Sequence, residues 1–111
     1  HNALSKLELA GRLRRPLFPS YCCYNAHMYY ILLNSEKDRA AFIARMKEVD
    51  IHCVFHYVPL HTSPFVRRLG LVFGDLPRTM NLSARLVRLP VWIGIEKLQD
   101  NVIDNLTRFL I

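Results

Sequence analysis

The chain has 111 residues, 51% hydrophobic and 22% charged, which are values typical of a single globular domain with a modest core. No apolar run reaches the roughly 18 residues of a membrane-spanning helix, and the basic start of the chain does not resemble a signal peptide, so we expect no membrane partner. The net charge of +6 favours an anionic partner, but the basic residues are scattered and form no continuous stripe, which argues against nucleic acid.

The first predicted element is a helix over residues 3–13. It carries apolar side chains along one side at Leu4, Leu7, Ala10 and Leu13. Residues 16–20 contain two prolines and indicate a linker. The chain has no initiator Met and begins in what resembles mid-helix. We therefore expect an excised fragment or the processed end of a longer chain, in which this first segment docks elsewhere because its leucines have no partners inside this chain.

The three cysteines do not form a disulfide framework. Cys22 and Cys23 are adjacent, and neighbouring cysteines bridge each other only with strain. A structural zinc site needs about four ligands, and the nearest such pair, Cys53 and His56, falls on opposite faces of a predicted strand. We expect reduced thiols, no metal site and a cytoplasmic protein.

A strand–helix–strand unit is the clearest architectural signal. Residues 27–33 are aromatic and aliphatic almost throughout, which predicts a strand covered on both faces. Ser35 and Asp38 resemble a capping box for a helix over residues 36–49. The apolar stripe of that helix comprises Phe42, Ile43, Met46 and Val49. Alternation over residues 51–58 then predicts a strand with Ile51, Cys53, Phe55 and Tyr57 on one face.

The remaining elements are short and broken by glycine and proline. We first expect a helix over residues 65–69 and a loop over residues 70–78. A helix over residues 80–86, capped by Thr79, and a strand over residues 87–89, ended by Pro90, should follow. A connector over residues 92–94 then leads to the last helix, over residues 95–110. The natural packing is an α+β fold, in which a small sheet of about three strands has helices on one face.

Residues 51–61 are the candidate functional stretch. They contain three of the five histidines, and the predicted strand ends in a loop that carries Tyr57, His61, Thr62 and Ser63. Such loops often present polar groups at a site. From spacing alone the favoured interpretation is nevertheless a half-buried strand and a surface loop with structural histidines, because no complete catalytic set is visible.

Four stretches together resemble a known family: residues 10–16, 25–31, 54–61 and 88–91. They occur in the order and with the spacing of the C-terminal small domain of the PLP-dependent sugar-nucleotide aminotransferases of the DegT/StrS family. The likeness covers nearly all of the chain. It is strongest to the members that act on a nucleotide-linked 4-keto-6-deoxyglucose in enterobacterial surface-polysaccharide synthesis.

The resemblance implies a fold-type-I enzyme, usually a homodimer, with its active site between a large and a small domain. Residues 1–20 would then be a helix and linker from the large domain, and residues 21–111 the C-terminal small domain. The large domain would supply the Schiff-base lysine and most contacts to PLP. The lysines here, Lys6, Lys37, Lys47 and Lys97, are not in that setting, so we expect this chain alone to be inactive, with no catalytic or cofactor-binding residue.

By the same resemblance, Tyr57 and His61 would contact the nucleotide-sugar substrate, while His56 either assists or is structural. A Tyr hydroxyl and a His ring can supply hydrogen bonds of fixed geometry to a diphosphate and hydroxyls. Asn25 and His27 are expected to be structural, capping the first strand and holding the loop after Pro59.

The implied reaction moves an amino group, probably from glutamate, to a nucleotide-linked keto-deoxysugar for lipopolysaccharide or surface-polysaccharide synthesis. Where the family often has Pro-Ala-Gly, this chain has Pro-Phe-Val at residues 64–66, which leaves the sugar preference open. The alternative from another class is a stand-alone basic binding or regulatory module for an anionic partner, supported by the net charge of +6.

Overall fold

The centre of the fold is a three-stranded antiparallel sheet. The computed structural model describes residues 1–71 and 74–111. Its strands are β1 (Tyr29–Leu32), β2 (Val54–Phe55) and β3 (Leu86–Leu89), and β3 lies between the other two. Val87 of β3 is opposite Ile31 of β1 on one side and Phe55 of β2 on the other. Because β1 and β2 both run antiparallel to β3, they are parallel to each other, and the predicted strand–helix–strand unit is a split one with β3 inserted.

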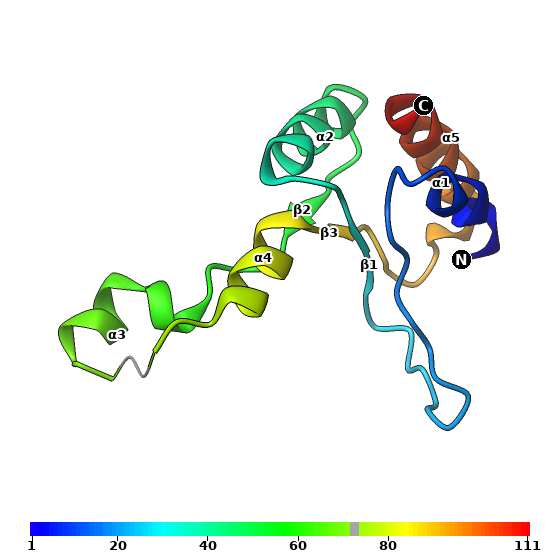
Figure 1. Cartoon of the computed structure of the whole chain (residues 1–111). Coiled ribbons are helices and arrows are strands. Elements are labelled where there is room, and N and C mark those ends of the chain that lie inside the picture. Colours follow the sequence, from blue (N-terminus) through cyan, green and yellow to red (C-terminus); the bar gives the residue numbers. More distant parts are fainter. Residues whose placement is uncertain (72–73) are drawn as a thin grey trace.

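Helices surround this sheet unevenly (Figure 1). In chain order they are η1 (Asn2–Leu4), α1 (Ser5–Leu9), α2 (Glu36–Glu48), η2 (Leu60–Thr62), α3 (Pro64–Arg68), α4 (Pro77–Arg85), η3 (Ile95–Lys97) and α5 (Gln99–Leu110). α1, α2 and α5 gather with the sheet, whereas α3 lies at the far end of a projection. In residues 1–71 and 74–111 no helix has the length and apolar character needed to cross a membrane. The predicted α+β class with a small sheet is confirmed.

The core lies between the sheet and these three helices. Its most buried side chains are Ile31, Leu33, Met46, Val87 and Leu106. The helix over residues 36–49 is confirmed as α2, with Phe42 and Met46 buried and Ile43 and Val49 packed against the core. Ser35 also caps it as predicted, because its Oγ accepts a hydrogen bond from the Asp38 backbone N–H at 3.1 Å.

The expectation that the N-terminal leucines lack partners is wrong. Leu4, Leu7 and Leu13 are only 4%, 5% and 4% exposed and belong to the main core. The helix ends at Leu9 instead of residue 13, and Gly11, with φ +69°, turns the chain back. The following segment then pairs with the edge of β1, where Arg14 and Leu32 exchange backbone hydrogen bonds of 2.8 and 2.9 Å. A domain boundary at residue 20 stays a prediction.

The strand predicted over residues 51–58 is wrong in length and position. Only Val54–Phe55 pair, and they form an edge of the sheet. Ile51 and Cys53 are buried as the alternation predicts, but Phe55 and Tyr57 are exposed. Tyr57 has φ +54°, a left-handed conformation that cannot continue a strand. The backbone therefore leaves the sheet before Pro59 has any effect.

The predictions for the second half of the chain are mostly confirmed. The short helix at residue 65 is α3, the strand before Pro90 is β3, and Trp92 and Ile93 lie in an exposed connector. The cap at Thr79 is wrong, because α4 begins at Pro77, which has no N–H to satisfy in the first turn. The last helix is split into η3 and α5. Of the loop expected over residues 70–78, residues 72–73 lie outside the described residues.

Candidate functional site

The candidate residues lie on a projection that extends away from the sheet between β2 and α4 (Figure 1). We call residues 56–71 and 74–76 the arm, and the remaining described residues the body. The radius of gyration is 15.8 Å, against about 13 Å for a compact chain of this length. No residue of η2 or α3 is buried. The arm exposes large apolar side chains at Tyr57, Val58, Leu60, Phe65, Leu69, Leu71 and Leu76.

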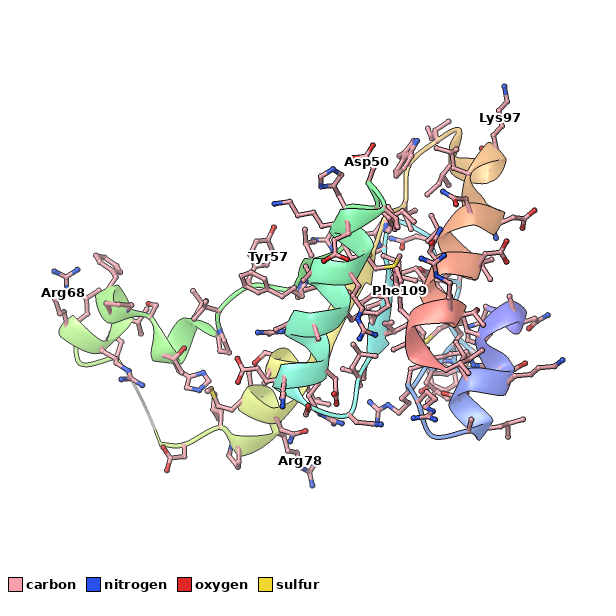
Figure 2. The ribbon with its side chains drawn as sticks, turned by 90° about the horizontal axis from the view of Figure 1, so that it is seen from above. Asp50, Tyr57, Arg68, Arg78, Lys97 and Phe109 are labelled. Atoms are coloured by element: carbon pink, nitrogen blue, oxygen red, sulfur yellow. The ribbon has the colours of Figure 1, made fainter. Side chains whose placement is uncertain are left out.

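His56 and Tyr57 form a pair at the base of the arm. Their ring centroids are 5.1 Å apart, with the rings tilted at 55°. Both line a shallow hollow whose other wall is the α4 side, formed by Thr79, Leu82, Ser83 and Leu86. Tyr57 is 70% exposed and lies where the arm meets the body, on the side of α2 (Figure 2). The pair can therefore offer an aromatic surface and hydrogen-bonding groups to a molecule that approaches from solvent.

His61 lies in a neighbouring hollow. It is half-buried in η2 and shares that hollow with Thr62, Arg67, Asp75 and residues at the start of α4. The Thr62 hydroxyl donates to the Pro59 carbonyl at 2.8 Å and fixes the turn that carries His61. The structure thus brings His56 and Tyr57 together but places His61 in a separate hollow beside them.

The helix predicted over residues 80–86 is confirmed as α4, but sequence reasoning did not place it at the candidate site. It borders both hollows, with Thr79, Leu82 and Ser83 in one and Pro77 and Met80 in the other. The sequence contained a signal for this placement, because the apolar residues Met80 and Leu82 lie on a short helix and were not assigned to the core. In the structure both side chains are exposed.

Arginines supply positive charge around the arm. Arg67 lines the His61 hollow. Arg68 lies at the tip of the arm, where its Nε donates to the Pro64 carbonyl at 3.4 Å (Figure 2). Positive charge beside imidazole and hydroxyl groups suits an anionic ligand with several oxygen atoms. Asn25 and His27, by contrast, interact with each other close to the start of β1, where Asn25 Oδ1 lies 2.6 Å from His27 Nδ1.

The residues of this chain do not fit a covalent PLP site. Lys6, Lys37, Lys47 and Lys97 are all exposed on helices and line neither of the hollows of the arm. A Schiff-base lysine needs a desolvated or charge-tuned setting to become a nucleophile. Among residues 1–71 and 74–111 no group of three or more metal-ligating side chains occurs. Burial raises the pKa of the Cys53 thiol to about 12, so this cysteine is not a nucleophile either.

Comparisons with known proteins give a consistent assignment. The model of the DegT/DnrJ/EryC1/StrS aminotransferase family matches residues 5–107. An uncharacterised protein of Methanocaldococcus jannaschii is 33% identical over 82 residues, which cover 70% of this chain and 21% of that protein.

Solved structures of other proteins share the fold. NtdA from Bacillus subtilis, with bound cofactor PMP, is 18% identical with a TM-score of 0.81, and the match covers 98% of this chain and 25% of NtdA. A protein of Streptococcus pneumoniae, provisionally named a sugar aminotransferase and solved in its PMP form, is 17% identical with a TM-score of 0.72, covering 97% of this chain and 28% of that one. The chain thus spans about a quarter of the length of these relatives. Because the family match extends over almost all of its residues, the chain belongs to the DegT/DnrJ/EryC1/StrS aminotransferase family.

Proposed function

We propose that this chain is the C-terminal small domain of a PLP-dependent aminotransferase that transfers an amino group from glutamate to a nucleotide-linked keto-deoxysugar. The observation that carries the proposal is the family match over residues 5–107. The sugar we propose is a 4-keto-6-deoxyglucose destined for lipopolysaccharide or another surface polysaccharide. The S. pneumoniae structure supports a sugar substrate, because that protein carries a sugar aminotransferase name.

The residues of this chain indicate which parts of the active site it would supply and which the large domain would supply. PLP supplies the electron sink for amino transfer when it is bound, and a large domain elsewhere in the same enzyme would hold it, since the lysines here are exposed. This chain would contribute contacts to the sugar nucleotide: the Tyr57 hydroxyl, the His61 ring, and His56 beside Tyr57. Arg67 would add charge opposite the diphosphate. We further propose a cytoplasmic homodimer, the usual form of such enzymes.

The test uses the longer protein encoded by the gene that contains this chain, with its two half-reactions measured separately. If Tyr57 and His61 contact the diphosphate sugar, Tyr57→Phe and His61→Ala should each slow the sugar half-reaction about ten- to a hundredfold, the effect of one lost hydrogen bond to a charged group. The glutamate half-reaction should be spared. Tyr21→Phe and His52→Ala, at exposed body positions, are the matched controls.

A loss that affects both half-reactions would show that Tyr57 and His61 have a structural role. Equal losses in both half-reactions, together with a lower melting temperature, mean that the substitutions loosen the scaffold. The 111-residue chain alone is the negative control, expected to show no turnover with added PLP. If the gene encodes no large domain with a PLP lysine, the enzyme proposal fails as a whole.

A further inference from the structure

The arm has two roots in the body, and both lie against helix α2. The first root is β2, which ends at Phe55, and the second is α4, which ends at Arg85. Between these roots no residue of η2 or α3 is buried. The direction of the arm is therefore set mainly by how its roots are held, since its own side chains bury little against the body.

One side chain touches both roots. Arg39 of α2 donates from Nη1 to the Ser83 carbonyl of α4 at 3.0 Å. Its guanidinium carbon also lies 5.4 Å from the centre of the Phe55 ring of β2. Its Nη2 contacts Glu36 Oε1 at 3.2 Å, and the Arg39 side chain is only 17% exposed. Arg85 anchors α4 separately, because its Nη1 donates to the Leu33 carbonyl just after β1 at 3.2 Å.

The chemistry of each contact requires an arginine. Ser83 is in the last turn of α4, so its carbonyl has no amide partner within the helix, and a cation there is favourable for the helix dipole. A guanidinium is planar, so it can donate along its edge while its face covers an aromatic ring. The ammonium of a lysine is a single point charge on a flexible stem, and it would keep one contact at the expense of the other.

We propose that Arg39 is the positioning residue of the arm: by holding β2 and α4 together it fixes where His56, Tyr57 and His61 stand relative to the body. The proposal that this position matters for the sugar substrate rests on the proposed function. The positioning itself is a property of this chain alone, so it can be tested without any enzyme assay.

The direct test measures the distance between arm and body in the 111-residue chain. Spin labels at Arg68→Cys on the arm tip and Lys97→Cys on the body, in a Cys22→Ser, Cys23→Ser background, mark opposite ends of the molecule (Figure 2). Arg39→Met should shift or broaden the distance distribution, and Arg39→Lys should do so partly. Arg45→Met is the matched control, because Arg45 is an exposed arginine of α2 that lines a hollow shared with Phe109 of α5.

Amide exchange gives a second measurement that does not depend on labels. Without the charge-assisted bond to Ser83, exchange at the end of α4 should become at least about tenfold faster in Arg39→Met. Exchange in α5 and the melting temperature should stay close to those of the Arg45→Met control. Distance distributions and exchange rates that match the control would overturn the proposal, and so would a general unfolding of the body that Arg39→Lys fails to rescue.

The longer enzyme separates this proposal from the proposed function. There, Arg39→Met should raise the KM for the sugar nucleotide and leave the glutamate half-reaction unchanged. If the distance distribution broadens while both half-reactions stay at their original rates, Arg39 positions the arm as proposed, and the assignment of Tyr57 and His61 to the substrate site is wrong.

Discussion

The body and the arm both carry large apolar side chains, but the core of the body buries them and the arm exposes them. Leu106 in α5 is 1% exposed, whereas Leu60 in η2 is 78% exposed. The body folds three separate segments of the chain over one sheet, so the leucines of its core meet partners from distant parts of the sequence. The arm leaves the sheet and returns to it (Figure 1), and no residue of its helices η2 and α3 is buried. Apolar composition therefore predicts which residues need burial, but topology decides whether this chain provides it.

The largest expected effect comes from the same substitution made in both regions. Leu106→Ala should destabilise the chain by about 2–5 kcal/mol, because it opens a cavity in a closed core. Leu60→Ala removes a side chain that is already in water and should change the free energy of unfolding by less than about 0.5 kcal/mol. Urea unfolding followed by circular dichroism measures both. Similar losses for the two variants would mean that the arm is packed in solution and that the comparison is false.

A smaller effect is expected at two serine helix caps. Ser35 caps α2 in the body and Ser63 caps α3 in the arm, with nearly equal hydrogen bonds of 3.1 and 3.2 Å to the backbone. Ser35→Ala should cost about 1 kcal/mol of global stability. Ser63→Ala should leave the global unfolding curve unchanged and only speed amide exchange within α3, because the arm opens without the body. A global loss for Ser63→Ala would show that the two regions unfold together.

The smallest expected effect is a pH dependence confined to the body. The backbone N–H and the Nε of Arg15 each donate to the Glu8 carboxylate at 2.7 Å, and these hydrogen bonds lower its pKa below the ordinary value of 4.5. The bonds favour the charged carboxylate in the folded state. Their stabilisation is therefore complete above pH 4.5 and is lost as the pH falls through the lowered folded pKa.

In Glu8→Gln, the free energy of unfolding should consequently fall less as the pH is lowered below 4.5, as measured by urea unfolding at a series of pH values. Glu48→Gln, which removes a charge from an exposed position on α2, is the control. The effect is modest because the Glu8–Arg15 pair is partly open to solvent, which screens it. If Glu8→Gln and Glu48→Gln give identical stability profiles, the Glu8–Arg15 pair does not stabilise the fold. Apolar packing alone would then hold the N-terminal segment against the sheet.

Local patterns predicted the body well. The capping box at Ser35 and the apolar stripe through Phe42 and Met46 depend on residues close in sequence, and the structure has both. The burial of Leu13 could not be predicted in this way, because it depends on a turn at Gly11 and on the pairing of its neighbour Arg14 with Leu32, eighteen positions further along the chain (32 − 14 = 18). Long-range pairing leaves no periodic signal in either partner.

The candidate site was predicted less completely than the fold. Residues 51–61 contain three of the five histidines and Tyr57, and their role in binding stays a prediction. The strand that was expected to present them ends early, because Tyr57 adopts a positive φ that no alternation pattern encodes. The second wall of the candidate site is formed by α4, whose Thr79 is twenty-two positions after Tyr57 (79 − 57 = 22). The Ser83 carbonyl that Arg39 contacts also belongs to α4. Both depend on the arm returning to the sheet beside β2.

The position of β3 in the middle of the sheet has a consequence for biosynthesis. Ile31 and its partner Val87 are separated by 56 residues (87 − 31 = 56), and the whole arm is synthesised between them. On the ribosome, β1 and β2 therefore emerge without the strand that joins them, and closing so long a loop delays their pairing. During that interval the edges of two apolar strands are unpaired and open to association with other chains. The chain remains vulnerable to aggregation until residues 86–89 leave the exit tunnel, and α5 must follow before Leu106 can seal the core.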